Sequence, residues 1–428
     1  MKKETPQLAI SDKKGSIFAL PRLEAAGMKG GCFFRIDAAE LIELPPASRL
    51  FMLPDRAPVG YDPCAARIIT LEGDHYAVCA FVSPGYTTTY NAAYRETQKS
   101  GMLPLFSYSA VSFYKGKYYA ACVRVDKDRR HDPRFININA VRKNTLRFKK
   151  LFPKNRLITH LKDCALLHGC PNAQNFFLSR YEAPLPTSPS CNSSCIGCIS
   201  YQPPGRCPAA QPRIKFTPAP EEIAEVALLH IANVRNSIVS FGQGCEGEPL
   251  LAGGVIEKAI RIIRQRTPKG TININTNASR PDMLSRLFNA GLNSVRVSIN
   301  SAREEYYARY YKPRGYLFKD VIRSIRIAKA KNKFVSINYL TMPGFTDSKD
   351  EFAALGDFIE TNRPDMIQWR NLNLDPIRYF KELNIRVDSA EMLGIREIMN
   401  KLKKTFPKLK MGYFNPSRAI APRDSERD

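Results

Sequence analysis

The sequence predicts an α/β protein: a parallel sheet, open or curled into a partial barrel of six β/α units, preceded by a separate sheet-rich α+β domain. Two observations predict this fold. Between residues 176 and 375, short apolar runs alternate with longer amphipathic segments, as in βαβ units. Up to residue 175, short alternating apolar runs are instead separated by proline and glycine. A chain of 428 residues is long enough for two to three such cores.

The first domain, residues 1–175, is expected to be built mainly from short strands. Its clearest feature is a hairpin of residues 105–114 and 118–125, joined at Gly116, where glycine can take a positive φ. Helical periodicity then appears between residues 141 and 168, with basic residues along one face. A solvated helix surface explains those charges without any partner.

The second domain, residues 176–375, is expected to contain the parallel sheet. Its predicted strands are residues 176–181, 237–241, 271–275, 294–299, 333–340 and 365–370. Its predicted helices are residues 218–234, 254–267, 281–290, 302–311, 317–331 and 348–361. Six strands would leave one side of the barrel open to large substrates. A C-terminal extension, residues 376–428, follows with one helix, a short strand around residues 409–413 and a basic tail.

Composition and charge limit the class of protein. Apolar residues make up 44% and charged residues 25% of the chain, as in soluble globular proteins, and no apolar run is long enough to cross a bilayer. Eleven cysteines, without a secretory signal, are expected in a reducing cytoplasm and not in a disulfide framework. The net charge of +25 favours polyanionic partners.

Three cysteines within eight residues form the most distinctive motif. Cys191, Cys195 and Cys198 have the spacing CxxxCxxC and follow the first predicted strand, where parallel sheets carry their functional loops. Structural zinc sites almost always use four ligands, whereas a cubic iron–sulfur cluster can leave one iron open to a small molecule. Cys207 lies close enough in sequence to be a fourth thiolate, so zinc remains an alternative here.

A glycine-rich turn follows the second predicted strand and contains Gly247, Glu248 and Pro249. Glycines expose backbone amides and carbonyls, and the carboxylate beside them can accept a hydrogen bond from an ammonium group. Such a turn alone is more often simple turn geometry. Its position one β/α unit after the cysteine loop makes it informative.

Together, the cysteine motif and the Gly-Glu-Pro turn make residues 176–375 resemble the radical S-adenosylmethionine (SAM) superfamily, and the resemblance implies a partial (β/α)6 TIM-like barrel of that type. Two features depart from the pattern: Gly197 stands where an aromatic residue is common, and Cys207 lies nearby. The resemblance implies that Cys191, Cys195 and Cys198 bind a 4Fe-4S cluster whose open iron chelates SAM.

The resemblance also implies roles for residues at the strand ends. Gly247, Glu248 and Pro249 would hold the amino group of SAM, and Asn277 and Ser298, with Asn300 behind them, are candidates for ribose or carboxylate contacts. Leu340 would cover the adenine. Helix capping explains the polar strand-end residues equally well.

The implied reaction is reductive cleavage of SAM to a 5′-deoxyadenosyl radical, which abstracts a hydrogen atom from a substrate. It needs an electron donor of the flavodoxin or ferredoxin type and no acid–base residue, so no catalytic residue is assigned beyond the cluster. His168, Cys164 and Cys170 suggest a second metal site, but three ligands without a fourth favour ordinary packing. No cysteine follows Cys245, which excludes a C-terminal auxiliary cluster.

Two other functions stay open. One is a zinc-stabilised, basic nucleic-acid-binding protein without catalysis, and the other is an iron–sulfur electron carrier. For the radical enzyme we favour RNA as the substrate, because basic residues cluster at 127–130, 142–156 and 401–410, with aromatic residues such as Phe148 and Phe152 among them.

Overall fold

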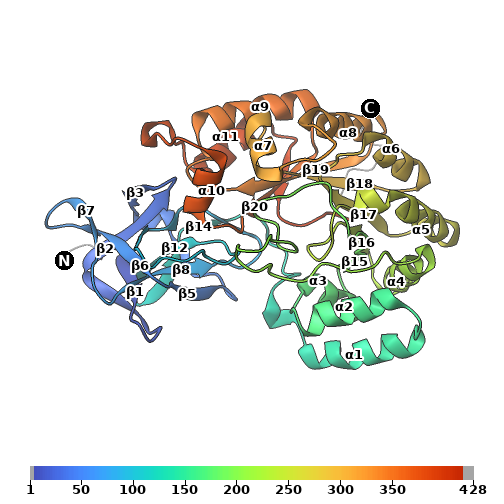
Figure 1. The fold of residues 1–428 in the computed structure, drawn as a ribbon, viewed down its shortest axis with the longest axis horizontal. Coiled ribbons are helices and arrows are strands. Elements are labelled where there is room, and N and C mark those ends of the chain that lie inside the picture. Colours follow the sequence, from blue (N-terminus) through green and yellow to red (C-terminus); the bar gives the residue numbers. More distant parts are fainter. Residues whose placement is uncertain (1–3, 418–428) are drawn as a thin grey trace.

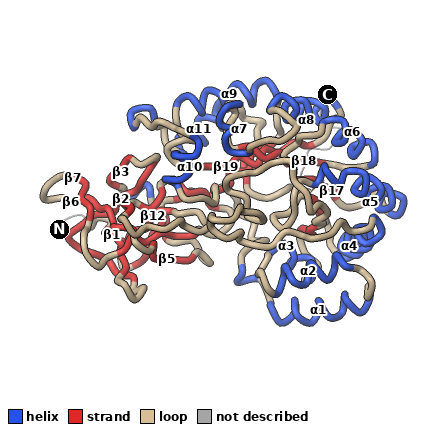
Figure 2. Tube along the Cα trace, viewed as in Figure 1, coloured by secondary structure: helices blue, strands red, loops and turns tan. Residues whose placement is uncertain are grey.

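The computed structural model describes residues 4–417. Antiparallel strands form one end of an elongated molecule, and a parallel sheet with helices around it forms the other (Figure 1). The helices cover the outside of the parallel sheet, whereas the other end is almost entirely strand and loop (Figure 2). This arrangement confirms the predicted α/β core and the sheet-rich domain that precedes it. The predicted basic tail lies mostly in residues 418–428, outside the described part of the chain.

Within residues 4–417, seven strands form one parallel sheet in which chain neighbours are also sheet neighbours. The strands are β15 (Glu182–Pro184), β16 (Ile238–Phe241), β17 (Thr271–Thr276), β18 (Ser294–Ile299), β19 (Phe334–Thr341), β20 (Met366–Asn371) and β21 (Lys410–Gly412). The helices that follow them are α4 (Pro220–Asn233), α5 (Gly253–Arg266), α6 (Pro281–Ala290), α7 (Glu304–Tyr311), α8 (Phe318–Ala330), α9 (Lys349–Asn362), α10 (Pro376–Leu383) and α11 (Ile395–Thr405).

Each helix packs against the sheet through one apolar face. In α5, Ile256, Ile260 and Ile263 are fully buried at helical spacing, while the basic residues of the same helix face outward. The strands between the helices are buried on both faces, as in other parallel sheets. This double burial explains why short continuous apolar runs marked the strands in the sequence.

The first strand is not where the sequence suggested. Residues 171–177 form helix α3 (Pro171–Phe177), and the strand begins at Glu182. Phe176 and Phe177 are both buried against Phe148, so the apolar run is explained by helix packing. A short apolar run does not distinguish a buried helix from a strand. Pro184 is tolerated in β15 because this strand forms the edge of the sheet.

The predicted opening of the barrel is partly closed. The predicted strand around residues 409–413 joins the sheet as β21, beside β20. Beyond it, Asn415 donates through Nδ2 to Glu182 Oε1 on β15 at 2.9 Å, and its carbonyl accepts from Arg130 at 3.1 Å. These contacts join the two edges of the sheet. The strands at the two edges, β15 and β21, do not pair, so the sheet remains the partial barrel that the sequence predicted, spanned at this point by side-chain contacts.

The N-terminal domain is a largely antiparallel assembly of short strands. They are β1 (Gln7–Ser11), β2 (Ile17–Lys29), β3 (Cys32–Arg35), β4 (Ile42–Glu43), β5 (Arg49–Leu53), β6 (Arg56–Asp62), β7 (Arg67–Thr70), β8 (Tyr76–Phe81), β9 (Tyr86–Thr88), β10 (Asn91–Ala92), β11 (Tyr94–Glu96), β12 (Ser109–Tyr114), β13 (Lys117–Ala120) and β14 (Cys122–Arg124). The predicted hairpin is confirmed as β12 and β13, with positive φ at Lys115 and Gly116. Helices α1 (Ile138–Leu151) and α2 (Arg156–Leu166) follow, before α3.

The N-terminal domain packs against the last long strand of the barrel. Asn371, at the end of β20, accepts a hydrogen bond from the Thr88 amide at 2.8 Å and donates to the Tyr86 carbonyl at 3.0 Å. Thr87 Oγ1 donates to the Trp369 carbonyl at 3.2 Å, and Trp369 itself is fully buried. The β9 segment therefore lies beside the mouth of the barrel.

No helix within residues 4–417 is long and apolar enough to cross a membrane.

Candidate active site

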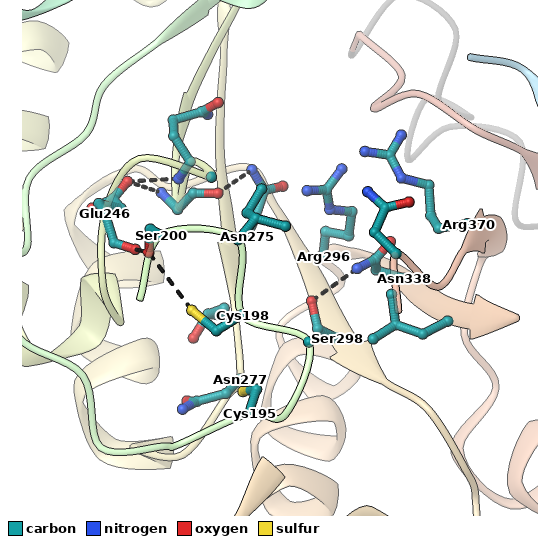
Figure 3. Close-up of a pocket in the computed structure, with 18 of the residues that line it drawn as sticks. Cys195, Cys198, Ser200, Glu246, Asn275, Asn277, Arg296, Ser298, Asn338 and Arg370 are labelled. Atoms are coloured by element: carbon teal, nitrogen blue, oxygen red, sulfur yellow. Dashed lines mark hydrogen bonds between the residues drawn. The ribbon is translucent and has the colours of Figure 1, made fainter. Parts of the chain in front are cut away.

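A cavity of about 410 Å³ lies at the carboxyl ends of the parallel strands, where such sheets place their functional loops. Its walls come from the cysteine loop, from the turns after β16 to β20, from the N-terminal domain and from the residues after β21. Most residues singled out from the sequence line it: Cys191, Cys195, Cys198, Gly247, Glu248, Pro249, Asn277, Ser298 and Leu340. Figure 3 shows part of this wall.

The cysteine loop lacks regular secondary structure and is held in place by backbone hydrogen bonds to the end of α7. The Ser194 amide donates to the Tyr311 carbonyl at 2.9 Å, and the Ile196 amide donates to the Tyr310 carbonyl at 3.1 Å. From the other side, the Arg314 amide donates to the Asn192 carbonyl at 2.9 Å. These bonds fix the position of the loop, which is not part of a helix or a sheet.

The three thiols face a common space. Burial raises the pKa of Cys191, and it raises the pKa of Cys195 well above the usual value, with the charges of neighbouring thiols adding to the effect. Arg213 lies beside them, with Nη2 at 3.6 Å from Cys198 Sγ. Three partly buried thiols next to one arginine are costly to ionise together, so a bound metal cation would be needed to hold them as thiolates.

Gly197, which departs from the superfamily pattern, has a structural explanation. A Cβ at this position would lie 2.8 Å from the Tyr310 hydroxyl oxygen. Tyr310 is buried and lines the cavity next to the cysteines. An aromatic ring from helix α7 thus occupies the space that an aromatic residue in the loop would otherwise fill.

Cys207, the candidate fourth thiolate, lies elsewhere. Its side chain is buried near Arg378, whose Nη1 is 3.8 Å from the sulfur, and its amide donates to the Met102 sulfur at 3.2 Å. It is not among the residues that line the cavity. The structure therefore separates Cys207 from the other three cysteines.

The Gly-Glu-Pro turn binds directly to the segment that leads into the cysteine loop. The Gly247 amide donates to the Ser188 carbonyl at 2.7 Å, and the Glu248 amide donates to the Ser190 carbonyl at 2.8 Å. A Cβ on Gly247 would lie 2.0 Å from the Ser190 carbonyl oxygen. Only glycine permits this approach, so the two motifs form one rigid unit.

Glu248 is buried and its carboxylate is already engaged by the protein. Oε1 accepts hydrogen bonds from the Leu250 amide, at 2.9 Å, and from the Thr276 hydroxyl, and Oε2 accepts from the Asn277 amide at 2.8 Å. Burial raises its pKa to about 7, and it forms no ion pair among the described residues. A carboxylate has about four acceptor positions, so one remains for a cationic ligand.

Glu246 is a structural residue of the site that sequence reasoning missed. Its two oxygens accept four backbone hydrogen bonds: from Thr187 and Ser188 before the cysteine loop, and from Gly242 and Gln243 after β16, all at 2.7–2.9 Å. Figure 3 shows Glu246 and the two bonds on the side of the turn. Burial raises its pKa to about 7. Its position between two glycines of a turn could have indicated a carboxylate that satisfies loop amides.

The polar residues predicted to contact SAM already form hydrogen bonds with other residues of the protein. The Asn277 side-chain amide donates to Asn192 Oδ1 at 2.9 Å and to Ser193 Oγ at 3.1 Å, which ties it to the cysteine loop. Ser298 lines the cavity and accepts from Asn338 Nδ2 at 3.0 Å. Asn300 is fully buried, donates to the Tyr379 hydroxyl at 3.2 Å, and is not among the cavity-lining residues.

Comparison with known proteins agrees with this geometry. Residues 185–356 match the family model of the radical SAM superfamily. These residues form a radical SAM domain. The matched segment contains the cysteine loop, the Gly-Glu-Pro turn and the strands from β16 to β19. The members of this superfamily are enzymes, and the match covers less than half of this chain.

Individual relatives of the radical SAM domain are distant. The FeMo cofactor biosynthesis protein NifB of Klebsiella pneumoniae is 25% identical over 183 residues, and the match covers 38% of this chain and 38% of that protein. Among solved structures, methylornithine synthase (PylB) matches with a TM-score of 0.37 at 18% identity, covering 64% of this chain and 74% of that one. HydG from Carboxydothermus hydrogenoformans matches with a TM-score of 0.34 at 14% identity, covering 66% and 80%.

A second thiol group lies behind the turn of the radical SAM domain, and its members differ from the predicted ones. Instead of His168, Cys164 and Cys170, the structure brings His160, Cys164 and Cys245 together, with their ligand atoms within 4.8 Å of one another. Hydrogen bonding from Cys245 lowers the pKa of Cys164 to about 5, and the same contact raises the pKa of Cys245. This group connects α2 to the Gly-Glu-Pro turn.

Three further polar residues of the barrel wall were not among the assigned site residues: Arg296 on β18, Asn338 on β19 and Arg370 on β20. Arg296 and Ser298 are two residues apart on one strand, so both face the cavity. The same alternation places Asn338 and Leu340 together on β19. The period-2 pattern around the assigned residues could therefore have indicated two of the three.

Proposed function

We propose that the radical SAM domain binds a 4Fe-4S cluster through Cys191, Cys195 and Cys198 and binds SAM beside it, and that the protein cleaves SAM reductively to act on a substrate in the same cavity. One observation carries this proposal. The three thiols and the Gly-Glu-Pro turn line one cavity, and two backbone hydrogen bonds join their segments, although the two motifs lie far apart in sequence.

The thiols fit a cubic cluster better than a zinc ion. Four ligands around one zinc ion, each about 2.3 Å from it, must lie close together. Among residues 4–417, only His160, Cys164 and Cys245 bring three candidate ligand atoms within 4.8 Å of one another. Cys191, Cys195 and Cys198 are spread more widely around their space, and Cys207 is buried at a different place. A cluster held by three thiolates accounts for both facts.

The cavity next to the thiols fits SAM. A buried carboxylate that lacks an ion pair, Glu248, favours a positively charged ligand, and SAM carries an ammonium and a sulfonium group. The polar groups of Asn277 and Ser298 and the apolar side chain of Leu340 also line the wall. We assign Gly247, Glu248 and Pro249 to the amino group, Asn277 and Ser298 to the ribose or carboxylate, and Leu340 to the adenine. Asn300 supports the wall from behind.

A reduced cluster held by Cys191, Cys195 and Cys198, with SAM beside it, would supply the chemistry of a 5′-deoxyadenosyl radical, which is hydrogen-atom abstraction from a substrate. The protein's own part is to position these groups and to keep water away. Tyr310 and Tyr311 are buried beside the thiols, and Phe81 and Val82 of the N-terminal domain line the same cavity. Enclosure by these side chains protects a reactive intermediate from solvent. The electron would come from a flavodoxin- or ferredoxin-type donor.

The position of the N-terminal domain supports a role in substrate binding for residues 1–175. Phe81, Val82, Pro84 and Ser107 come from this domain and line the cavity of the radical SAM domain, residues 176–375. The extension that begins at residue 376 also contributes, through residues 413–415.

We also place the protein in a reducing compartment such as the cytoplasm, because all eleven of its cysteines are free thiols.

Replacement of Glu248 by glutamine tests the assignment of the SAM side of the cavity. The iron content after anaerobic reconstitution should stay near that of the wild type, because Glu248 does not bind the cluster. The dissociation constant for SAM, measured by calorimetry, should rise about tenfold or more, since a charge-assisted contact contributes about 1.5–3 kcal/mol. The NH2 group of the glutamine would also face the backbone N–H of either Leu250 or Asn277, where the carboxylate accepted a hydrogen bond.

Glu221→Gln, on the exposed first turn of α4, is the matched control and should leave SAM affinity unchanged. Equal SAM affinity in the Glu248 variant and in this control would remove Glu248 from the SAM site. A stoichiometric zinc content in the reconstituted wild type would support the zinc-stabilised alternative. A stable cluster without SAM binding would support the electron carrier.

RNA is a candidate substrate, and the basic face of α1 supports this proposal. Arg142, Lys143, Arg147 and Lys150 are exposed along this helix. The expectation that Phe148 takes part in base stacking is wrong, because this residue is buried in the core. Only phosphate contacts are therefore expected from α1.

The RNA proposal predicts salt-dependent binding of bulk tRNA. Changing Arg142, Lys143, Arg147 and Lys150 to glutamine should flatten the log–log slope of affinity against salt concentration by roughly 0.7–0.9 for each phosphate that the variant no longer neutralises. Lys149 is left unchanged because its Nζ already donates to Thr159 at 2.7 Å. No tRNA binding at low salt, or equal slopes in both proteins, would contradict a role for α1 in RNA binding.

A further inference from the structure

The inner wall of the cavity carries two arginines that take no part in the proposed SAM site. Arg296 on β18 and Arg370 on β20 both line the cavity, and Asn338 lies on β19 between them. Figure 3 shows the three side chains extending from neighbouring strands to the same side of the sheet. They lie beside Ser298. In the sheet, β17 separates their strands from β16, the strand that leads into the Gly-Glu-Pro turn.

Arg296 has too few partners for a buried guanidinium. Its Nη1 donates to Gln368 Oε1 at 3.3 Å, and its Nε is buried without any hydrogen-bond acceptor. It forms no ion pair within residues 4–417. Burial lowers its pKa to about 9, and the charge of Arg370 contributes to this shift, so the two guanidinium groups are close enough to repel each other.

Arg370 is held in position without being neutralised. Its Nη1 donates to the Tyr413 carbonyl at 3.0 Å, and its guanidinium carbon lies 3.9 Å from the centre of the Tyr413 ring. The described residues provide no carboxylate at ion-pair distance from it. The stacking fixes the plane of the guanidinium while its remaining N–H groups stay available.

The other charges around this part of the cavity do not compensate for the pair. The carboxylate of Glu182 acts on Arg296 electrostatically, but it already accepts from Asn415 and lies 3.5 Å from Arg130. His131 is neutral at physiological pH, because burial lowers its pKa to about 4. Enclosed cations without counter-ions are costly, which makes this wall a favourable place for an anion.

We propose that Arg296 and Arg370 bind an oxyanion, a carboxylate or a phosphate, that the substrate carries into the cavity. This inference rests on the proposed function, since it names the substrate class of that same site. Arginine suits the role because its planar donors match the oxygens of either group. Asn338 adds an acceptor: its Oδ1 is buried without a partner and can bind a donor on the same substrate. The cavity size suits a small molecule.

Thermal unfolding in the presence of small anions tests this site directly. The midpoint for the wild type is measured in millimolar inorganic phosphate or acetate, against sodium chloride of equal ionic strength. At least one of the two oxyanions should raise the midpoint, and the more effective one identifies the group. In Arg296→Gln and Arg370→Gln, measured separately, the half-saturating concentration should rise about tenfold or more.

Arg266→Gln is the matched control, because it removes the same charge from the exposed surface of α5. It corrects for the general stabilisation of proteins by phosphate and should behave as the wild type does. Without oxyanion, both cavity variants should unfold at or above the wild-type midpoint, because each removes an uncompensated cation. Equal anion dependence in all four proteins, or no dependence in the wild type, would overturn the proposal.

The SAM affinity of the two cavity variants separates this site from the SAM site. We expect a dissociation constant for SAM within about twofold of the wild type. A tenfold weakening in both variants would assign the arginines to the carboxylate of SAM and would overturn their assignment to the substrate. The thermal measurement requires no SAM cleavage, so failure of the wild type to cleave SAM would count against the proposed function and not against anion binding.

Discussion

Cys195→Ala is expected to abolish iron binding. Cys195 lies in the middle of the loop, its thiol is enclosed, and its pKa is raised by burial and by the two neighbouring thiols. A cluster with three protein ligands has no spare thiolate to replace the missing one. The variant should lose the bound iron, the brown colour and all SAM cleavage, and Cys191→Ala and Cys198→Ala should do the same. Iron and sulfide content after anaerobic reconstitution measures the loss.

Cys207→Ala is the matched control for the three ligands. Its thiol lies beside Arg378 and does not line the cavity, so the variant should keep wild-type iron content and SAM cleavage. Loss of metal from Cys207→Ala to the same extent as from Cys195→Ala would support a closed site with four thiolates and would contradict a three-ligand cluster.

Glu246→Ala is expected to have the largest effect on stability. It would leave four backbone N–H groups without their acceptor: two buried ones before the cysteine loop and two partly buried ones after β16. Each unsatisfied buried donor costs about 1–3 kcal/mol, and water can compensate for some of them, so the free energy of unfolding should fall by about 3 kcal/mol or more. Denaturant unfolding of the apo-protein measures this change. The same variant should lose iron more readily, because the loop entry is no longer fixed.

Glu257→Ala provides the comparison for Glu246. Glu257 also accepts from two partners, Arg261 and Arg286, but on the outer surface of α5, where the loss should be below about 1 kcal/mol. Similar unfolding free energies for the two variants would show that Glu246 does not hold the cysteine loop to the Gly-rich turn.

Much of the barrel could be predicted from the sequence because each of its elements carries its own signal. The strands after residue 237 are short apolar runs, and the helices between them have apolar faces at helical spacing. Gly291 ends α6 in a left-handed conformation, directly after the predicted end of this helix at residue 290. The first strand was misplaced because Phe176 and Phe177 are buried by helix packing, and burial alone gives the same apolar run in either conformation.

The site was predictable only where its residues are contiguous in sequence. The cysteine loop and the Gly-Glu-Pro turn are local motifs, whereas Arg296 and Arg370 meet only because a single strand separates β18 from β20 in the folded sheet. The wall formed by residues 81–84 and 413–415 depends on long-range packing and has no local signal. Asn300 shows the opposite case: its type and position suggested a ligand contact, but its amide is turned to Tyr379.

The measurement that tests the central claim most directly is the formation of 5′-deoxyadenosine. The protein is reconstituted anaerobically with iron and sulfide, reduced with dithionite and incubated with SAM, and the products are separated by chromatography. We predict 5′-deoxyadenosine from the wild type and from Cys207→Ala, and none from Cys195→Ala. A wild-type protein that holds its cluster and binds SAM but yields no 5′-deoxyadenosine, with or without a biological electron donor, would contradict the proposed function.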